Sequence, residues 1–355
     1  MTFPPPRRVV LLKPCCIGDV LMATPLARSL TAAWPDAALD WAVGDHSRAV
    51  LRGNPDVAAL VDASGTLRGE LRPAAVARLI GALRRGGYDA AFVAERSPIP
   101  AAIARLAGIP RRVGLDSGGR GRWHTVRVPT RPDDPRHETE IYLDLARAVG
   151  VAPAAPRPVF APSPADAAAA DAALAAAGAA RWPRPWLVIH PGGGQNPGAQ
   201  RLDKRWPADR FAAVAARWAA SGTAIVIGGP GDGVEAAAVV AGAAAAAGGA
   251  AGGVVGSAGP VASLAGRLAL GATAALVARA DAYLGNDSGV SHLAAAVGTP
   301  VVVVFGPTSA ARYGPVPGAG EAVAAGAAAG GDIRAVAVEA VWAAVARARG
   351  GVGRS

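Results

Sequence analysis

Apolar residues recur along the chain in short unbroken runs, separated by longer stretches in which polar and apolar positions alternate at helical spacing. Short runs of this kind are typical of buried strands, and the amphipathic stretches between them are typical of helices. Regular strand–helix alternation indicates a parallel sheet with helices on both faces. We therefore predict a doubly wound α/β sheet in each half of the chain. The clearest predicted strands are 8–12, 38–43, 88–93, 186–190, 224–228 and 300–305, and the clearest predicted helices are 20–34, 73–85, 99–107 and 208–221.

The Pro-rich segment 150–164 and the Ala-rich stretch that follows it interrupt this alternation. Such composition is typical of a linker and of the end of a domain. We predict an N-terminal domain over 1–165 and a second domain over 166–335. The last amphipathic stretch, 336–355, is predicted to be a helix that packs back on the N-terminal domain.

Composition narrows the class of protein. No stretch is long and apolar enough to predict a membrane span, and no secretion signal precedes the first strand. The two cysteines are adjacent, which predicts no disulfide framework and favours a reducing cytoplasm. The net charge of +10 suits anionic small ligands or an anionic membrane surface. Nucleic acid is the weaker choice, because the aromatic residues do not alternate with basic residues as they do in nucleic-acid recognition modules.

A polar turn, Gly285-Asn-Asp-Ser-Gly289, separates a predicted strand from a helix that begins near Val290. A helix N-terminus presents free N–H groups and the positive end of the helix dipole, so it attracts anions such as phosphate. An alternative stays open here, in which Asp287 or Ser288 only caps the helix.

Two further loops of the second half have the composition of phosphate-binding loops. Pro191-Gly-Gly-Gly194 directly follows the strand that ends at His190, and glycine removes the Cβ that would keep a diphosphate away from the backbone. Lys204, in the next loop, supplies a point charge. Lys204 and Lys13 are the only lysines among the 36 basic residues.

The first predicted strand leads into the loop Lys13-Pro-Cys-Cys-Ile-Gly-Asp19 and then into a helix. This loop lacks the G-x-G-x-x-G pattern of dinucleotide-binding folds. Asp19 is either a helix-capping carboxylate that interacts favourably with the positive end of the helix dipole or a general base at the carboxyl edge of the sheet. The arginine-rich segment 111–131, which includes Arg120 and Arg122, is either solvated surface or a loop that receives an anionic partner.

Four segments, taken in order, resemble glycosyltransferase family 9, the ADP-heptose-type heptosyltransferases of GT-B fold. The most specific is the Asn286-Asp-Ser-Gly289 block. The other three are Val10–Leu26 with its Gly18-Asp19, His190-Pro-Gly-Gly193 with Lys204-Arg-Trp-Pro207, and Phe305-Gly-Pro-Thr308 with Tyr313-Gly-Pro315. The resemblance extends over essentially the whole chain, and it implies two Rossmann-like domains that face each other across a cleft.

The resemblance also implies an inverting transfer, without metal or other cofactor, of a heptose or related sugar from a nucleotide-diphosphate sugar. Asp19 matches the general base of the family. Lys13, Arg120 and Arg122 are expected on the acceptor side. The expected donor-binding residues are Gly192, Gly193, Lys204, Glu235, Asp287, Ser288, Gly289, Val290 and His292, with Lys204 and the N–H groups of 288–290 on the diphosphate, Asp287 on sugar hydroxyls and Glu235 on the ribose.

Two features depart from the family pattern. Cys15-Cys16 replaces small hydroxyl residues, and the expected base-contacting loop, 256–270, aligns poorly, which leaves the nucleotide open. The acceptor also stays open between a glycan, a glycolipid and a small molecule, and peripheral contact with the inner face of a membrane is compatible with the charge. Two rival readings remain, a non-catalytic sugar-nucleotide-binding protein and a GT-B sugar-nucleotide epimerase.

Overall fold

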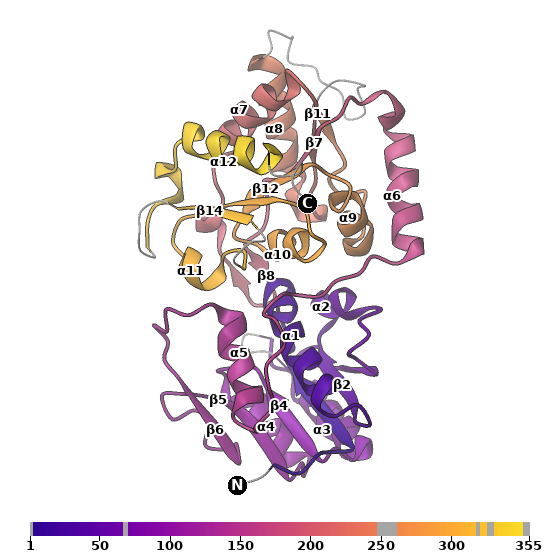
Figure 1. Cartoon of the computed structure of the whole chain (residues 1–355), viewed down its shortest axis with the longest axis vertical. Coiled ribbons are helices and arrows are strands. Elements are labelled where there is room, and N and C mark those ends of the chain that lie inside the picture. Colours follow the sequence, from indigo (N-terminus) through magenta and orange to yellow (C-terminus); the bar gives the residue numbers. More distant parts are fainter. Residues whose placement is uncertain (1–2, 67–69, 247–260, 317–319, 325–329, 351–355) are drawn as a thin grey trace. The chain divides into compact units, whose positions relative to one another are not determined.

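The computed structural model describes residues 3–66, 70–246, 261–316, 320–324 and 330–350 (Figure 1). The chain divides into two compact units. Unit 1 comprises Met1–Phe160 and Asn196–Ala199, and unit 2 comprises Ala161–Gln195 and Gln200–Ser355.

Unit 1 contains a six-stranded parallel sheet in the order β3-β2-β1-β4-β5-β6. The first strand lies in the middle of the sheet, and the order reverses beside it, as in dinucleotide-binding folds. The strands are β1 (Arg8–Leu12), β2 (Ala38–Val43), β3 (Ala59–Asp62), β4 (Ala90–Val93), β5 (Arg111–Ser117) and β6 (Val126–Thr130).

The helices of unit 1 cover the sheet because alternate strand residues point to opposite faces. Val10, Leu12 and Val93, for example, pack with buried residues of α3 and α4, such as Leu79 and Ile103. The helices are α1 (Ile17–Ala33), α2 (Asp45–Arg48), α3 (Pro73–Gly86), α4 (Pro98–Leu106) and α5 (Glu138–Arg147).

Unit 2 repeats this topology. Its parallel sheet has the order β11-β10-β7-β12-β13-β14, so the strands of the two units correspond one to one. The strands are β7 (Trp186–His190), β10 (Thr223–Val226), β11 (Val261–Ser263), β12 (Ala282–Asn286), β13 (Val301–Phe305) and β14 (Gly320–Ala324), and a short hairpin is formed by β8 (Gln195–Asn196) and β9 (Ala199–Gln200).

The core of unit 2 lies on both faces of its sheet. Leu187 and Ile189 point to the face covered by α7, α8 and α12, whereas Val188 points to the face covered by α6, α9 and α10. Burial on both faces explains why these strands are continuous apolar runs. The helices are α6 (Pro164–Ala176), α7 (Ala208–Ala219), α8 (Gly233–Ala246), α9 (Leu270–Val277), α10 (Gly289–Ala296), α11 (Ala310–Tyr313) and α12 (Val338–Gly350).

The last helix corrects one prediction. We expected residues 336–355 to pack on the N-terminal domain, but α12 packs on strands β12, β13 and β14 and on α7, all in unit 2 (Figure 1). Its apolar stripe is short, because Val341, Ala344 and Val345 are the buried residues, and they join the core of unit 2. Residues 351–355 of the predicted segment lie outside the described residues.

The sequence pattern does not predict three of the outer strands, β6, β11 and β14. Each of them is hydrogen-bonded to a neighbour on one side only. β6 also contains Pro129, a residue found mainly on edge strands because it cannot donate to the ladder, and β11 has only three residues. Over the described ranges, no helix has both the length and the hydropathy that crossing a membrane requires.

Candidate active site

The loops that follow β7 and β12 meet at the carboxyl edge of the unit 2 sheet, because these two strands are paired neighbours. β7 ends at His190, whose buried ring lies between two polar side chains. His190 Nδ1 is 3.4 Å from Ser288 Oγ, and His190 Nε2 is 3.4 Å from Asp232 Oδ2. The histidine therefore connects the start of α10 to the loop before α8.

Asn286, the last residue of β12, holds this edge together and is buried. Its amide nitrogen donates to the carbonyl oxygens of Pro191 (2.8 Å) and Gly192 (3.0 Å). Its amide oxygen accepts from the backbone N–H of Trp206 at 2.9 Å. One side chain thus connects the strand end, the Gly-rich loop and the segment that carries Lys204.

The glycines of this loop are required by close packing. A Cβ on Gly192 would lie 2.1 Å from Asp232 Oδ1, and a Cβ on Gly193 would lie 2.7 Å from the Cβ of Ser288. Gly193 also has a φ of +97°, which L side chains rarely adopt. Any larger residue at either position would push the loop away from the start of α10.

Lys204 and Asp287 form an ion pair beside these loops, with Lys204 Nζ 2.7 Å from Asp287 Oδ2. The same carboxylate oxygen accepts from the hydroxyl of Thr308, also at 2.7 Å. The Asp287 side chain is 8% exposed and that of Lys204 is 20% exposed, so the ammonium group retains access to solvent.

The first turn of α10 has no side-chain cap. Ser288 is the N-cap residue, but no side-chain hydrogen bond caps this helix. Its hydroxyl lies instead near His190 and 3.4 Å from Ser291 Oγ. A first turn leaves N–H groups without intrahelical acceptors, so the backbone at Gly289 and Val290 can donate to an anion.

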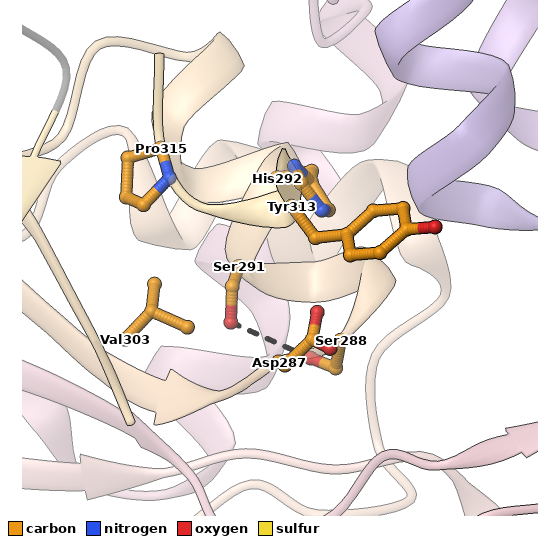
Figure 2. Close-up of a pocket in the computed structure, with 7 residues that line it drawn as sticks. All are labelled: Asp287, Ser288, Ser291, His292, Val303, Tyr313 and Pro315. Carbon is orange, nitrogen blue, oxygen red and sulfur yellow. Dashed lines mark hydrogen bonds between the residues drawn. The ribbon is translucent and has the colours of Figure 1, made fainter. Parts of the chain in front are cut away.

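A small depression adjoins Asp287 and Ser288 (Figure 2). Figure 2 shows apolar residues on one side of it and polar side chains on the other. The depression is lined by Asp287, Ser288, Ser291, His292, Val303, Tyr313 and Pro315.

Glu235 lies in the first turn of α8 and forms an ion pair with Arg205. Its second oxygen, Oε2, is buried without a hydrogen-bond partner in the described part of the chain, so it can accept from a ligand. Arg205 also donates to the Gly193 carbonyl (2.9 Å) and to Asp232 (3.2 Å). Burial tends to raise the pKa of Asp232, but its contacts with His190, the Gly229 N–H and Arg205 lower it below its usual value.

In unit 1, the corresponding sheet edge holds a cluster of charges. Lys13 follows β1 and Glu95 follows β4, the neighbouring strand, and Lys13 Nζ lies 2.8 Å from Glu95 Oε1. Asp19, in the first turn of α1, is 3.7 Å from the same ammonium group. The Asp19 side chain is 36% exposed, whereas that of Lys13 is only 6% exposed.

Asp19 is also fixed from α5, because Tyr142 donates its hydroxyl hydrogen to Asp19 Oδ1 at 3.1 Å. Burial tends to lower the pKa of Lys13, but the charges of Asp19 and Glu95 raise it above its ordinary value, so the ammonium stays protonated. Burial raises the pKa of Glu95, although Lys13 opposes this. The cluster therefore presents one accessible carboxylate, Asp19, on a buried and charged support.

The two cysteines, for which we predicted no disulfide framework, form a disulfide with each other between β1 and α1. Cys16 is the N-cap residue of α1. A bridge between neighbouring residues closes no long loop, so its effect on chain entropy is confined to this turn.

The arginines expected on the acceptor side lie in different places. Arg120 is exposed in the turn after β5, at the same sheet edge as Asp19. The Arg122 guanidinium lies over the Trp123 ring. The Trp123 carbonyl accepts a hydrogen bond from Arg112 at the start of β5. Arg122 is thus grouped with residues remote from the strand ends, and the structure does not bring it to Asp19.

Sequence reasoning missed several residues of these clusters. Arg205 follows Lys204 directly and Asp232 belongs to a Gly-rich turn after β10, so their sequence neighbours could have marked both as candidate site residues. Glu95 and Tyr142 could not have been found in this way. Glu95 contacts Lys13 from 82 residues away, and Tyr142 contacts Asp19 from 123 residues away. In the portion of the chain that the structure describes, no three His, Cys, Asp or Glu side chains group as metal ligands.

Known proteins agree with this architecture. The family profile "Glycosyltransferase family 9 (heptosyltransferase)" matches residues 76–333. Lipopolysaccharide heptosyltransferase 2 of Salmonella typhimurium is 28% identical over 314 residues, which cover 85% of this chain and 83% of that protein.

Two solved structures have the same fold. A family 9 glycosyl transferase from Veillonella parvula superposes with a TM-score of 0.81 at 19% identity, over 98% of this chain and 99% of that chain. The ADP-heptose lipopolysaccharide heptosyltransferase II of E. coli has a TM-score of 0.76 at 22% identity, over 96% and 98%. The predicted α/β fold of GT-B type is confirmed, and each of its two parallel sheets has six strands.

Proposed function

Because the chain belongs to glycosyltransferase family 9, the heptosyltransferases, we propose that it transfers a heptose from ADP-heptose to a sugar hydroxyl. The names of its relatives suggest ADP-heptose as the donor and a lipopolysaccharide as the acceptor. The observation that supports this proposal best is the Lys204–Asp287 ion pair, which lies beside a Gly-rich loop and an uncapped helix start.

The donor diphosphate is proposed to bind at this ion pair. Lys204 turns from Asp287 to the phosphate oxygens, and the N–H groups of Ser288, Gly289 and Val290 donate to them. Asp287 keeps its hydrogen bond from Thr308 and can then accept from sugar hydroxyls. As the bond to the anomeric carbon breaks, negative charge grows on the leaving ADP, and these fixed donors stabilise it without a metal ion.

The rest of the donor fits the neighbouring groups. The unpaired Oε2 of Glu235 suits a ribose hydroxyl, and the small size of Gly192 and Gly193 lets the diphosphate approach the backbone. The polar side chains of His292 and Tyr313, which lie beside Asp287, suit hydroxyl groups of the sugar. Residues 256–260 of the loop expected at the base lie outside the described residues.

Asp19 is proposed to act as the general base. Its carboxylate takes the proton of the acceptor hydroxyl while the oxygen attacks the anomeric carbon from the face opposite ADP, which inverts that carbon. Tyr142 and Lys13 hold the carboxylate in place. Lys13 itself is buried, so we assign it to Asp19 rather than to the acceptor, and exposed Arg120 remains the candidate for anionic groups of the acceptor.

A transfer assay tests this function. The protein is incubated with ADP-heptose and a lipopolysaccharide core that lacks its heptose, and ADP release and the mass of the product are measured. ADP should raise the melting temperature more than UDP or GDP does, because ligands that bind the folded state stabilise it. Stabilisation by ADP-heptose without ADP release would contradict transfer and favour a non-catalytic binding protein.

A further inference from the structure

A group of arginines around Trp123 has no part in the proposed reaction. The guanidinium groups of Arg105 and Arg122 lie 5.8 and 4.9 Å from the centre of the Trp123 ring. Arg112 donates to the Trp123 carbonyl at 2.7 Å, and Arg127 donates to the carbonyl of Arg122. We call this surface of unit 1 the Trp123 patch. It consists of Trp123 and Leu106 with Arg84, Arg105, Arg112, Arg122 and Arg127, and Arg84 donates to the Leu106 carbonyl.

The arginines of the Trp123 patch gather around one aromatic ring and one exposed leucine without an acidic partner among the residues that the structure describes. Within the described ranges none of the five forms an ion pair with a carboxylate, and their hydrogen bonds go to backbone carbonyls. Three exposed arginines of unit 2, Arg217, Arg279 and Arg347, each pair with a carboxylate and so provide a comparison of the same charge.

This concentration of unneutralised charge has a physical cost, which an anionic partner would remove. Burial and the charge of Arg105 together lower the pKa of Arg112 from its ordinary value, in agreement with mutual repulsion. Opposite charge brought to the patch would relieve this repulsion.

The apolar members of the patch indicate what kind of anion fits. Leu106 is 56% exposed at the end of α4, beside the guanidinium of Arg84. Tryptophan and arginine side chains are well suited to a membrane–water interface, because their apolar bodies enter the lipid and their polar ends stay at the headgroups. The Trp123 ring already carries two guanidinium groups, which leaves less of it for stacking on a nucleic acid base.

We propose that the Trp123 patch docks unit 1 on an anionic lipid surface. The arginines bind the phosphate headgroups, and Leu106 and Trp123 enter the interface. The proposal does not rest on the transfer reaction, because no residue of the patch contacts Asp19 or Lys204 in the interactions described above.

Co-sedimentation of the full chain with vesicles tests the proposal. Vesicles of phosphatidylglycerol and phosphatidylcholine are compared with vesicles of phosphatidylcholine alone, at two salt concentrations. Each basic residue near an anionic surface contributes about 1 kcal/mol, so the triple variant Arg84→Gln, Arg105→Gln, Arg127→Gln should bind the anionic vesicles about 100-fold more weakly.

The matched control carries the same loss of charge at ion-paired sites, as Arg217→Gln, Arg279→Gln, Arg347→Gln. It should bind within a few-fold of the parent protein. Equal weakening of both triple variants would overturn the proposal, since net charge alone would then explain binding. Equal binding of the parent to phosphatidylcholine vesicles would overturn it as well.

Two further measurements test the details. Brominated lipids should quench the fluorescence of the parent protein, and Trp123→Phe should remove that quenching. Binding of a single-stranded RNA that depends on the patch, without binding to vesicles, would overturn the lipid assignment. Transfer to a soluble acceptor is measured in parallel, and a triple variant that transfers normally but does not bind vesicles separates docking from the proposed chemistry.

Discussion

Each unit places one of the two lysines of the chain at the carboxyl edge of its sheet, within reach of an aspartate. The surroundings differ. Lys13 is buried and held by a second carboxylate, Glu95, whereas Lys204 is partly exposed and lies among glycine loops. Asp19 is the accessible partner in unit 1, and Asp287 is the buried partner in unit 2.

The two roles proposed for the units follow from this difference within one shared topology. In unit 1 the buried cation and Tyr142 support an exposed carboxylate, an arrangement that suits proton transfer. In unit 2 a fixed carboxylate holds an accessible cation, an arrangement that suits binding of a diphosphate. If this comparison holds, the same type of substitution should have different consequences in the two units.

The largest effect is expected for Asp19→Asn, which removes the proposed base and keeps the shape of the side chain. Loss of general base catalysis typically lowers a rate by about 10²–10⁴-fold. We expect kcat to fall by this amount while the Kd for the donor stays within a few-fold. The control is Asp45→Asn, since Asp45 is also an acidic residue in a first helical turn after a strand of the same sheet. Turnover of Asp19→Asn within a few-fold of the parent would disprove the assignment.

The next effect is on stability, in Lys13→Met. This change leaves Glu95 largely buried without its cation, and loss of one partner of a buried pair costs about 3 kcal/mol. The melting temperature of unit 1 should fall by roughly 6–12 °C. Adding Glu95→Gln should recover part of the loss. Arg217→Met, which breaks an exposed pair with Glu339, should lower the melting temperature far less, because exposed ion pairs contribute little to stability. An equal loss in both variants would refute the supporting role of Lys13.

Lys204→Ala should instead weaken donor binding. Loss of a charge-assisted contact with the diphosphate costs about 1.5–3 kcal/mol, which raises the donor Kd by about 10–150-fold. Calorimetric titration with ADP measures it without an acceptor. Arg279→Ala removes a similar charge from an exposed pair in the same unit and should leave the Kd unchanged. A donor Kd that Lys204→Ala does not alter would exclude this lysine from the site.

The smallest effect concerns acid stability in unit 1. Burial of His124 against Gly114, together with Arg112 and Arg127 and despite Asp116, lowers its pKa to about 4. A histidine with a depressed folded-state pKa stabilises the fold above its unfolded pKa, and this contribution is lost as the pH falls from about 6.5 towards 4. Between pH 7.5 and 5 the loss is about 2 kcal/mol.

His124→Gln removes this titration. Thermal unfolding at the two pH values should show a smaller acid shift for His124→Gln than for the parent. His46→Gln is the comparison, because burial lowers the pKa of His46 as well but Glu70 opposes it, so this variant should reduce the acid shift less than His124→Gln does. An identical acid shift in the parent and His124→Gln would show that other groups cause the loss.

Much of the fold could be predicted because strand runs such as 186–190 and 300–305 are buried on both faces, and the predicted bounds agree with β7 and β13 within one residue. The polar turn at Asn286 was recognisable because its glycines and its helix start are adjacent in sequence. The position of α12 was not predictable, because an amphipathic pattern shows that a helix packs but not which sheet it packs on.

The partners within the charge clusters could not be predicted from the sequence either. Lys13 looked like a residue for the acceptor, but the partner that buries it, Glu95, lies 82 residues away. Arg205 was not among the expected site residues, yet its side chain connects the Gly193 carbonyl with Asp232 and Glu235. Contacts between distant loops depend on strand pairing, which local sequence does not specify.

The side chain of Asn286 also constrains the order in which the protein can become functional during its synthesis. The carbonyl groups that it satisfies lie 95 and 94 residues earlier in the chain, and the N–H that it accepts from lies 80 residues earlier. A nascent chain that ends before β12 therefore already contains the Gly-rich loop and Lys204 but lacks the group that fixes them together. The proposed donor site can therefore form only after a ribosome has translated unit 2 as far as the end of β12.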